Sequence, residues 1–187
     1  FGANAQHLPA QSNRLSMSRL DRHNRTAMPP REDPFDSVLT TPFGAVGIRV
    51  TGVAVTEIRY LPKTAKEVAP RGALAERAAR QIQRYLRDPE YRFDLPLAIG
   101  GTPYQQRVWQ VLRSIPSGAL KTYGEVSSKL RSSPRAVGQA CGSNRLPIVI
   151  PCHRVVSATD IGGFAHHTDG YLIATKRWLL AHEGAAR

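Results

Sequence analysis

The strongest constraint on how this chain can fold is a pair of helix start signals in its second half. Thr122 is followed three residues later by Glu125, and this spacing predicts a capping box that opens a short helix. Ser133 is a suitable N-cap for a second helix, and Pro134 suits that helix's first position. Two short helices joined by a tight turn predict a helix-turn-helix.

The second helix of the pair carries small residues, and these bear on what the helix could contact. Arg135, Ala136, Gly138 and Ala140 lie along it. Helices that read the major groove of DNA carry long Asn, Gln and Arg side chains, whereas an Ala and Gly face suits a shallow approach, such as to the minor groove. Arg135, Ala136 and Gly138 are therefore candidate DNA-binding residues. Tight packing against another helix is the alternative interpretation of the same residues.

The charge of the chain is consistent with a polyanionic partner. The formal net charge is +12, and such an excess favours binding to nucleic acid. Between residues 102 and 159 the only acidic residue is Glu125. The basic residues of this stretch are Arg107, Arg113, Lys121, Lys129, Arg131, Arg135, Arg145 and Arg154. A solvated basic face would look the same, so the charge supports DNA binding only together with a recognition element.

Composition and periodicity divide the chain into four parts. Residues 1–34 are polar without a sustained period, so we expect an unstructured or vector-derived segment. Residues 35–96 predict a small α/β domain, with two or three antiparallel strands followed by an amphipathic helix within 71–88. A linker rich in Gly and Pro is expected over 97–103. Residues 104–187 predict a mostly α-helical DNA-binding and active-site domain.

The segment "IPCHRVV", residues 150–156, contains the candidate reactive group. We expect a short strand over residues 148–150 that ends at Pro151, because proline cannot donate to a β-ladder. Cys152 would then lie at a strand end. Adjacent side chains of an extended chain point to opposite sides, so His153 would reach the thiol more easily through a water molecule than directly. A structural Cys-His pair is the alternative.

Several motifs together resemble one family. "TYGEV", "RAVGQACGSN", "PCHRVV", "GGFA" and "KRWLLAHEG" follow one another between about Thr102 and Gly184, and in this order they resemble the O6-alkylguanine-DNA alkyltransferases. The resemblance implies an RNase H-like N-terminal domain and a winged-helix-like helix-turn-helix. It implies repair of O6-alkylguanine, with O4-alkylthymine as a further candidate substrate. By the same resemblance, the damaged base would be flipped from the minor groove and its alkyl group would pass irreversibly to the protein, once per molecule and without a cofactor.

The resemblance also assigns roles in the transfer step. Cys152 would accept the alkyl group, and His153 would take the thiol proton through water. Glu183 would orient His153, and Asn144 would brace the turn between the recognition helix and the active site. The hydroxyl of Tyr123 would hydrogen-bond the base and assist its departure.

A second set of roles concerns DNA and the flipped base. Arg135 would fill the gap that the flipped base leaves, and Tyr123 would crowd the phosphate. Backbone groups near Val155 and Ala165 would read the guanine edge. Phe164 stands where the family often has tyrosine, and it keeps an aromatic wall.

Other interpretations remain beside this one. A non-catalytic alkyl-lesion-binding protein would share the scaffold and lack a reactive thiol, and plain regulators or cysteine hydrolases fit the motifs less well. His166, His167 and Asp169 could suggest a metal site, but a solvated loop explains them and no metal is expected. With two cysteines in the chain no disulfide framework is expected. We expect a monomer that binds double-stranded DNA containing alkylated guanine, without membrane contact, in the cytoplasm and associated with the nucleoid.

Overall fold

The computed structural model describes residues 1–2 and 35–185, so the prediction for residues 1–34 lies almost entirely outside the described residues. The chain divides into two units, Phe1–Arg31 and Glu32–Arg187, and the helices and strands all belong to the second unit. None of the helices in the described ranges combines the length and apolarity that crossing a membrane requires.

The second unit begins with a three-stranded antiparallel sheet in the order β1-β2-β3. Its strands are β1 (Ser37–Thr41), β2 (Gly44–Thr51) and β3 (Ala54–Leu61). Gly44 starts β2 at a φ of 141°, and a Cβ there would lie 2.5 Å from the carbonyl oxygen of Leu61, so this position requires glycine. The sheet confirms the small antiparallel sheet predicted from the β-branched runs.

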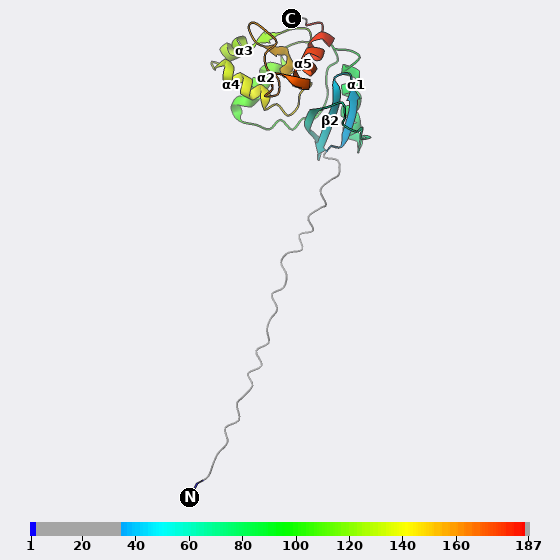
Figure 1. Ribbon diagram of the computed structural model, residues 1–187, viewed down its shortest axis with the longest axis vertical. Helices are drawn as coiled ribbons and strands as arrows, with labels where there is room; N and C mark the ends of the chain where they lie inside the picture. The colour runs from blue at the N-terminus through cyan, green and yellow to red at the C-terminus, as the bar shows by residue number, and fades with distance from the viewer. Residues whose placement is uncertain (3–34, 186–187) are drawn as a thin grey trace. The chain divides into compact units, whose positions relative to one another are not determined.

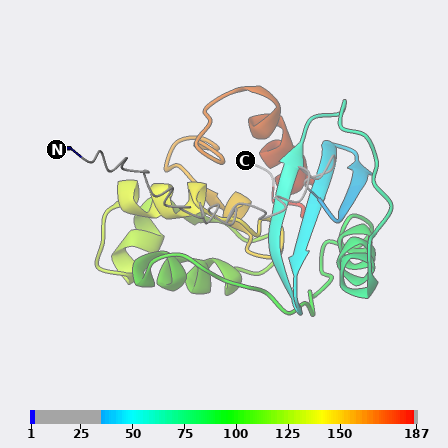
Figure 2. The same cartoon turned by 90° about the horizontal axis from the view of Figure 1, so that it is seen from below.

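The two faces of the sheet are covered by different parts of the chain. One face, with Ile48 and Tyr60, joins the main hydrophobic core together with helix α1 (Ala73–Tyr85). The opposite face carries a small separate cluster built on Phe35 and Ala45. Figure 2 shows α1 beside the sheet at one end of the unit, the green and yellow helices of the second half at the other end, and the red C-terminal helix next to the sheet between them.

The segment predicted as a linker is attached to the edge of the sheet. The amide of Val55 donates to the carbonyl of Pro96 at 2.8 Å, and the amide of Ala98 donates to the carbonyl of Val55 at 3.0 Å. One continuous core includes residues from both sides of this segment. The division into two domains at residues 97–103 stays a prediction.

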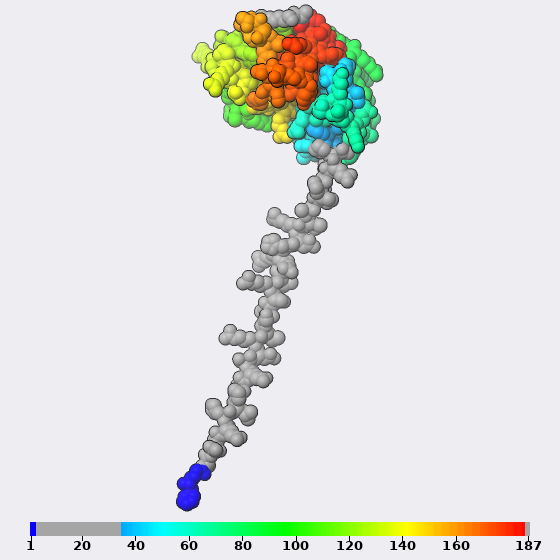
Figure 3. Space-filling model, in the orientation of Figure 1, coloured from blue at the N-terminus to red at the C-terminus, as the bar shows by residue number. Residues whose placement is uncertain are grey.

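The second half is mostly helical, as predicted. Its helices are α2 (Pro103–Arg113), α3 (Tyr123–Lys129), α4 (Pro134–Gly142) and α5 (Gly170–His182). In Figure 1, α3 and α4 lie next to each other at the edge away from the sheet. On the face in Figure 3, the orange and red C-terminal segment lies between the yellow-green helix pair and the cyan strands.

The caps predicted for the helix pair are present. The Thr122 side chain accepts from the amide of Glu125 at 3.1 Å, and a Glu125 oxygen accepts from the amide of Thr122 at 2.7 Å. Ser133 accepts from the amide of Ala136 at 3.2 Å. Each cap satisfies amide groups that the first helical turn leaves free, which is why the two helices start where the sequence indicates.

The strand expected over residues 148–150 is wrong. These residues form turns, and Ile148 has a left-handed φ of 71°. Their backbone is held by the Asn144 side chain instead of a ladder, and their apolar side chains pack into the core from a turn. Cys152 therefore does not end a strand: it starts a 3-10 helix, η1 (Cys152–Arg154).

A short strand follows the cysteine. β5 (Val155–Val156) pairs in parallel with β4 (Lys121–Thr122), the two residues before α3. This pairing joins the active-site segment to the first helix of the pair.

Candidate active site

Asn144 holds the turn that leads to the cysteine. Its Nδ2 donates to the carbonyl oxygen of Ile150 at 2.8 Å and lies 3.3 Å from Cys152 Sγ. Its Oδ1 accepts from the amide of Leu146 at 2.9 Å. One side chain thus fixes both ends of the turn after α4 and contacts the sulfur. This is the geometry expected of a residue that braces this turn.

His153 and Glu183 form a buried pair next to the cysteine. His153 Nε2 lies 2.8 Å from Glu183 Oε1, and both side chains are fully buried. Burial lowers the pKa of His153, although the Glu183 carboxylate acts in the opposite direction. An ionised carboxylate only accepts, so Nε2 carries the hydrogen and Nδ1 keeps a free lone pair. Nδ1 has no hydrogen-bond partner among the described residues.

Glu183 is the centre of a wider hydrogen-bond network. It accepts from the Tyr85 hydroxyl at 2.7 Å, and from Arg154 through Nε at 2.9 Å and Nη2 at 2.9 Å. Burial alone would raise the pKa of this carboxyl, but the hydrogen bonds from His153 and Arg154 outweigh burial and hold the pKa well below its usual value. The carboxylate is therefore ionised and fixes the histidine ring from one side.

Arg154 and Tyr85 were not predicted in these roles. Arg154 was counted with the basic stretch that could face DNA, but its side chain is 12% exposed and pairs with Glu183. It is therefore part of the support of the site. No motif pointed to Tyr85, because it lies on α1, far from the other members in the chain.

The thiol of Cys152 is protonated in this environment. Burial raises its pKa, while the hydrogen bond from Asn144 and the positive charge of Lys176 act in the opposite direction. No hydrogen bond joins the thiol to His153 Nδ1, so a bridging group is needed for proton transfer between them. The adjacent spacing predicted such an indirect relay.

Lys176 is a site residue that the sequence motifs did not identify. Its ammonium donates to the carbonyls of Val155 at 2.7 Å and Gly163 at 3.0 Å. The residue is completely buried, and burial lowers its pKa to about 8. The sequence feature that could have indicated a buried lysine is its position within the mostly apolar segment "YLIATKRWLL". The lysine joins the segment after the cysteine to the loop before α5.

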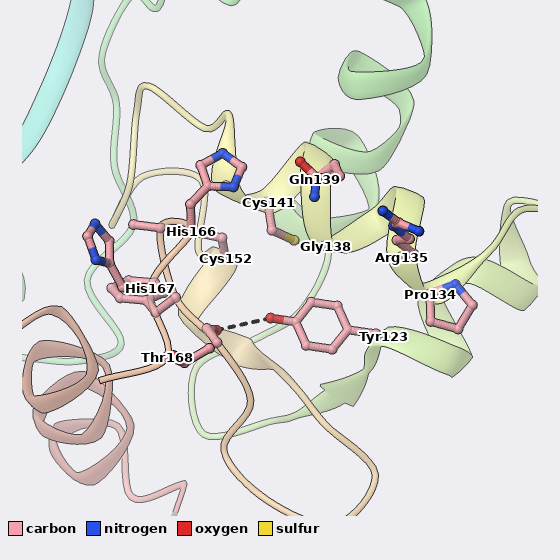
Figure 4. A pocket seen from close by; sticks show the side chains of 14 residues that line it. Tyr123, Pro134, Arg135, Gly138, Gln139, Cys141, Cys152, His166, His167 and Thr168 are labelled. Atoms are coloured by element: carbon pink, nitrogen blue, oxygen red, sulfur yellow. Dashed lines mark hydrogen bonds between the residues drawn. The ribbon is translucent and has the colours of Figure 1, made fainter. Parts of the chain in front are cut away.

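A hollow of about 400 Å³ gives access to the cysteine. Its lining includes Tyr123, Arg135, Gly138, Cys152 and Phe164, so α3, α4, η1 and the loop before α5 all contribute. Figure 4 shows Tyr123 and Arg135 on one side of this hollow, His166 and His167 on the other, and Cys141 and Cys152 between them. The volume accommodates a small aromatic ligand.

The remaining predicted site residues border the same hollow or lie close to it. Tyr123 donates to the carbonyl of Gly163 at 3.1 Å, the dashed line in Figure 4. Ala165 lines the hollow in a left-handed conformation with a φ of 49°. The Val155 carbonyl is already bound by Lys176.

The outer face of α4 is only partly small, because Gln139 is exposed beside the residues predicted to form it. Arg135 is exposed, and Ala136 and Gly138 are half-buried. Ala140 is buried, and its carbonyl accepts from the indole of Trp109 at 2.9 Å. Packing therefore explains Ala140, while the first turns of the helix remain accessible.

The described residues contain no group of three His, Cys, Asp or Glu side chains arranged to hold a metal. His166 and His167 line the hollow without forming such a group.

Known proteins resemble this chain in sequence and in fold. The family model "6-O-methylguanine DNA methyltransferase, DNA binding domain" matches residues 103–185. A methylated-DNA--protein-cysteine methyltransferase of Shigella flexneri is 46% identical over 92 residues, 48% of this chain and 52% of the relative. One from Archaeoglobus fulgidus is 40% identical over 109 residues, 57% of this chain and 73% of the relative.

Solved structures extend the similarity to most of the fold. The O6-methylguanine methyltransferase of Mycobacterium tuberculosis is 32% identical, with a TM-score of 0.67, over 80% of this chain and 92% of that one. M. tuberculosis OGT in complex with DNA has a TM-score of 0.65 at 32% identity, over 78% and 90% of the two chains. The chain spans about half the length of the Shigella relative it matches. Coverage of the Archaeoglobus and Mycobacterium proteins is higher, and the chain belongs to the methylated-DNA--protein-cysteine methyltransferase family.

Proposed function

We propose that this protein repairs O6-alkylguanine in double-stranded DNA by moving the alkyl group to Cys152. One observation carries the proposal. A protonated thiol lies at a hollow bordered by a helix-turn-helix, beside a neutral histidine that an ionised, buried Glu183 orients. The names of the relatives support the same reaction class.

The reaction is an in-line displacement at the alkyl carbon. The thiol proton passes to Nδ1 of His153 through a bridging water, and the thiolate attacks the carbon bound to O6. A sulfur–carbon bond forms, the carbon–O6 bond breaks, and guanine leaves with the bonding electrons. Guanine regains a proton at N1, so the products are a thioether on Cys152 and an unmodified base. The hydroxyl of Tyr123, which donates to the Gly163 carbonyl, would exchange that partner for the departing base.

Each molecule should react once. A thioether is not hydrolysed under ordinary conditions, so nothing regenerates the thiol. The step needs no oxidant, reductant or cofactor, because one alkyl group is exchanged for one proton. The protein would act as a stoichiometric transferase.

The helix pair would deliver the base to the hollow. The first turns of α4, with Ala136 and Gly138, would lie in the minor groove, and exposed Arg135 would fill the gap left by the flipped base. Tyr123 would crowd the neighbouring phosphate. Flipping costs a few kcal/mol, and less for a weakly paired damaged base. Phosphate contacts by exposed basic residues offset this cost.

Finer points of substrate and architecture belong to the same proposal. The flipped guanine would lie against Phe164 and be read by backbone groups near Val155 and Ala165. O4-alkylthymine is a second candidate substrate. The protein would act as a monomer on nucleoid DNA. The N-terminal sheet with α1 would be an RNase H-like domain, and the C-terminal part would be a winged-helix variant.

Intact mass spectrometry tests the proposal. The protein is mixed with a duplex carrying one O6-methylguanine, and Cys152→Ala and Cys141→Ala are compared with the unchanged chain. We expect a gain of one methylene that maps to Cys152, saturates at one equivalent and survives in Cys141→Ala. Tight binding of the lesion duplex without a mass gain would instead identify an alkyl-lesion-binding protein that signals to another repair pathway.

A further inference from the structure

Tyr60 has a buried hydroxyl that no protein group satisfies. Within the described ranges, the buried side-chain polar atoms without a hydrogen-bond partner are Thr41 Oγ1, Tyr60 Oη, Ser117 Oγ and His153 Nδ1. Buried polar atoms are almost always paired, so each exception calls for an explanation. The exception at His153 is explained by its proposed function as a base.

The ring of Tyr60 is fixed by aromatic neighbours. Tyr60 lies on β3 opposite Val46, and its side chain belongs to the main core. Its ring centroid is 5.8 Å from that of Phe43 and 5.4 Å from that of Phe164. The ring therefore has little freedom to turn its hydroxyl toward solvent.

Tyr60 and the cysteine line one hollow. A second hollow of about 410 Å³ is lined by Tyr60, Asn144, Cys152, Phe164 and Leu172, among others. It shares Cys152 and Phe164 with the hollow that gives access to the cysteine. Tyr60 thus reaches the thiol's surroundings from the N-terminal sheet, whereas Asn144 approaches it from the second half of the chain.

Electrostatics show what the hydroxyl can do. Burial raises the pKa of Tyr60 well above its usual value, and negative charge at Cys152, Tyr85 and Glu183 raises it further. The phenol therefore stays protonated at neutral pH, and it can donate toward a thiolate. The positive charge of Lys176 on α5 acts to lower the pKa of the thiol, and negative charge at Cys152 in turn raises the pKa of Cys141 on α4 and Tyr123 on α3.

We infer that Tyr60 is a positioning residue for the nucleophile: its hydroxyl donates through one water to the Cys152 thiolate and stabilises it. Asn144 Nδ2 donates to the sulfur from the turn after α4, and Tyr60 would donate from β3. No proton is transferred in this role. The inference rests on the proposed function of Cys152 as the alkyl acceptor.

Tyr60→Phe separates this role from a structural one. The substitution keeps the ring between its neighbours and removes only the oxygen. An unpaired buried hydroxyl opposes folding, so a purely structural Tyr60 predicts that the phenylalanine variant is equally or more stable and reacts normally. A donor to the thiolate predicts slower chemistry at unchanged or higher stability.

Iodoacetamide alkylation of Cys152 measures the effect without DNA. The rate is followed across neutral to alkaline pH by peptide mass mapping, in a Cys141→Ala background. Loss of a hydrogen bond to a charged group should raise the midpoint of the pH profile by about one unit. The remaining thiolate is more nucleophilic, so the rate near neutral pH should fall only about three- to fourfold. Tyr171→Phe is the matched control, because its hydroxyl donates at 3.5 Å to the backbone carbonyl of Tyr60 and not to the thiol.

Each outcome supports or overturns the role of Tyr60. A raised midpoint in Tyr60→Phe, with an unchanged midpoint in Tyr171→Phe and no loss of melting temperature, supports it. An unchanged midpoint in Tyr60→Phe overturns it, whether or not the rate falls. Methyl transfer from an O6-methylguanine duplex is measured on the same samples. If the unchanged chain accepts no methyl group, the proposed function fails independently of Tyr60.

Discussion

Replacing Glu183 by glutamine tests the network that supports His153. The Glu183 carboxylate accepts four hydrogen bonds, from Tyr85, His153 and, twice, Arg154, at 2.7–2.9 Å. Glutamine keeps the shape of the glutamate side chain but carries no charge. Its NH2 group would face one of the donors that now bind the carboxylate. The Arg154 guanidinium, 12% exposed, would then lack its carboxylate partner. Removing one partner of a buried ion pair costs about 3–5 kcal/mol.

That cost should be visible in thermal unfolding. For a folded unit of this size, 1 kcal/mol shifts Tm by about 2–4 °C, so Glu183→Gln should lower Tm by roughly 6–20 °C at neutral pH. Glu76→Gln is the matched control, because Glu76 forms an exposed ion pair with Arg80 on α1 and should change Tm little. Methyl transfer should also slow, because His153 loses its orienting charge.

A double-mutant cycle isolates the pairing between Glu183 and Arg154. Arg154→Met removes the charge that Glu183→Gln leaves unpaired, so the double variant should be more stable than the sum of the two single losses predicts. The buried network centred on Glu183 would be refuted if the two losses in the free energy of unfolding were strictly additive, or if Glu183→Gln lowered that free energy by less than about 1 kcal/mol.

The pH dependence of stability provides an independent check on the same carboxyl. Its pKa is lower in the folded state than in the unfolded chain, so its contribution to stability is present above the unfolded pKa of about 4.3 and is lost as pH falls. As the pH falls from about 5, the free energy of unfolding should therefore decrease more for the protein with Glu183 than for the Glu183→Gln variant. Parallel stability curves for the two proteins would contradict this assignment.

Three further predictions concern single positions. Thr122→Ala removes the cap of α3 and should cost about 1 kcal/mol in urea unfolding, and an unchanged midpoint would argue against the capping box. Gly44→Ala would bring a Cβ within 2.5 Å of the Leu61 carbonyl oxygen and should lower Tm clearly, whereas Gly100→Ala meets nothing within 4 Å and should not. Burial lowers the pKa of His153 from 6.5, so the neutral imidazole persists below that pH. As the pH is lowered from 7 to below 6.5, the rate of methyl transfer should therefore stay at its neutral-pH value. A fall centred at pH 6.5 or above would contradict a buried neutral base.

Local signals in the sequence were enough for the helix pair. The capping residues of α3 and α4 bond to amides within three residues, so no distant part of the chain is needed to decide where these helices start. The strands of the sheet were also predicted, because alternating β-branched runs between turn residues are a local pattern. Motif resemblance indicated Cys152, His153 and Glu183 as candidate site residues, and the structure pairs His153 with Glu183.

The tertiary structure decided what surrounds those residues. Residues 148–150 have the composition of a strand, yet the Asn144 side chain binds the backbone on both sides and makes them a turn. Arg154 has the charge of a DNA contact, yet it pairs with a carboxylate 29 residues away in the chain. Side chains that pair across such separations in the chain produce no periodic pattern from which the pairing could be predicted.

The sequence by itself therefore determined where the two helices of the pair begin, and it indicated the candidate reactive groups. Only the tertiary structure brought Tyr85 to Glu183, buried Lys176 against two carbonyls, and set Tyr60 of the sheet beside the cysteine. The physical reason is that capping and alternation act between near neighbours, whereas burial and charge pairing depend on which distant segments the core brings together.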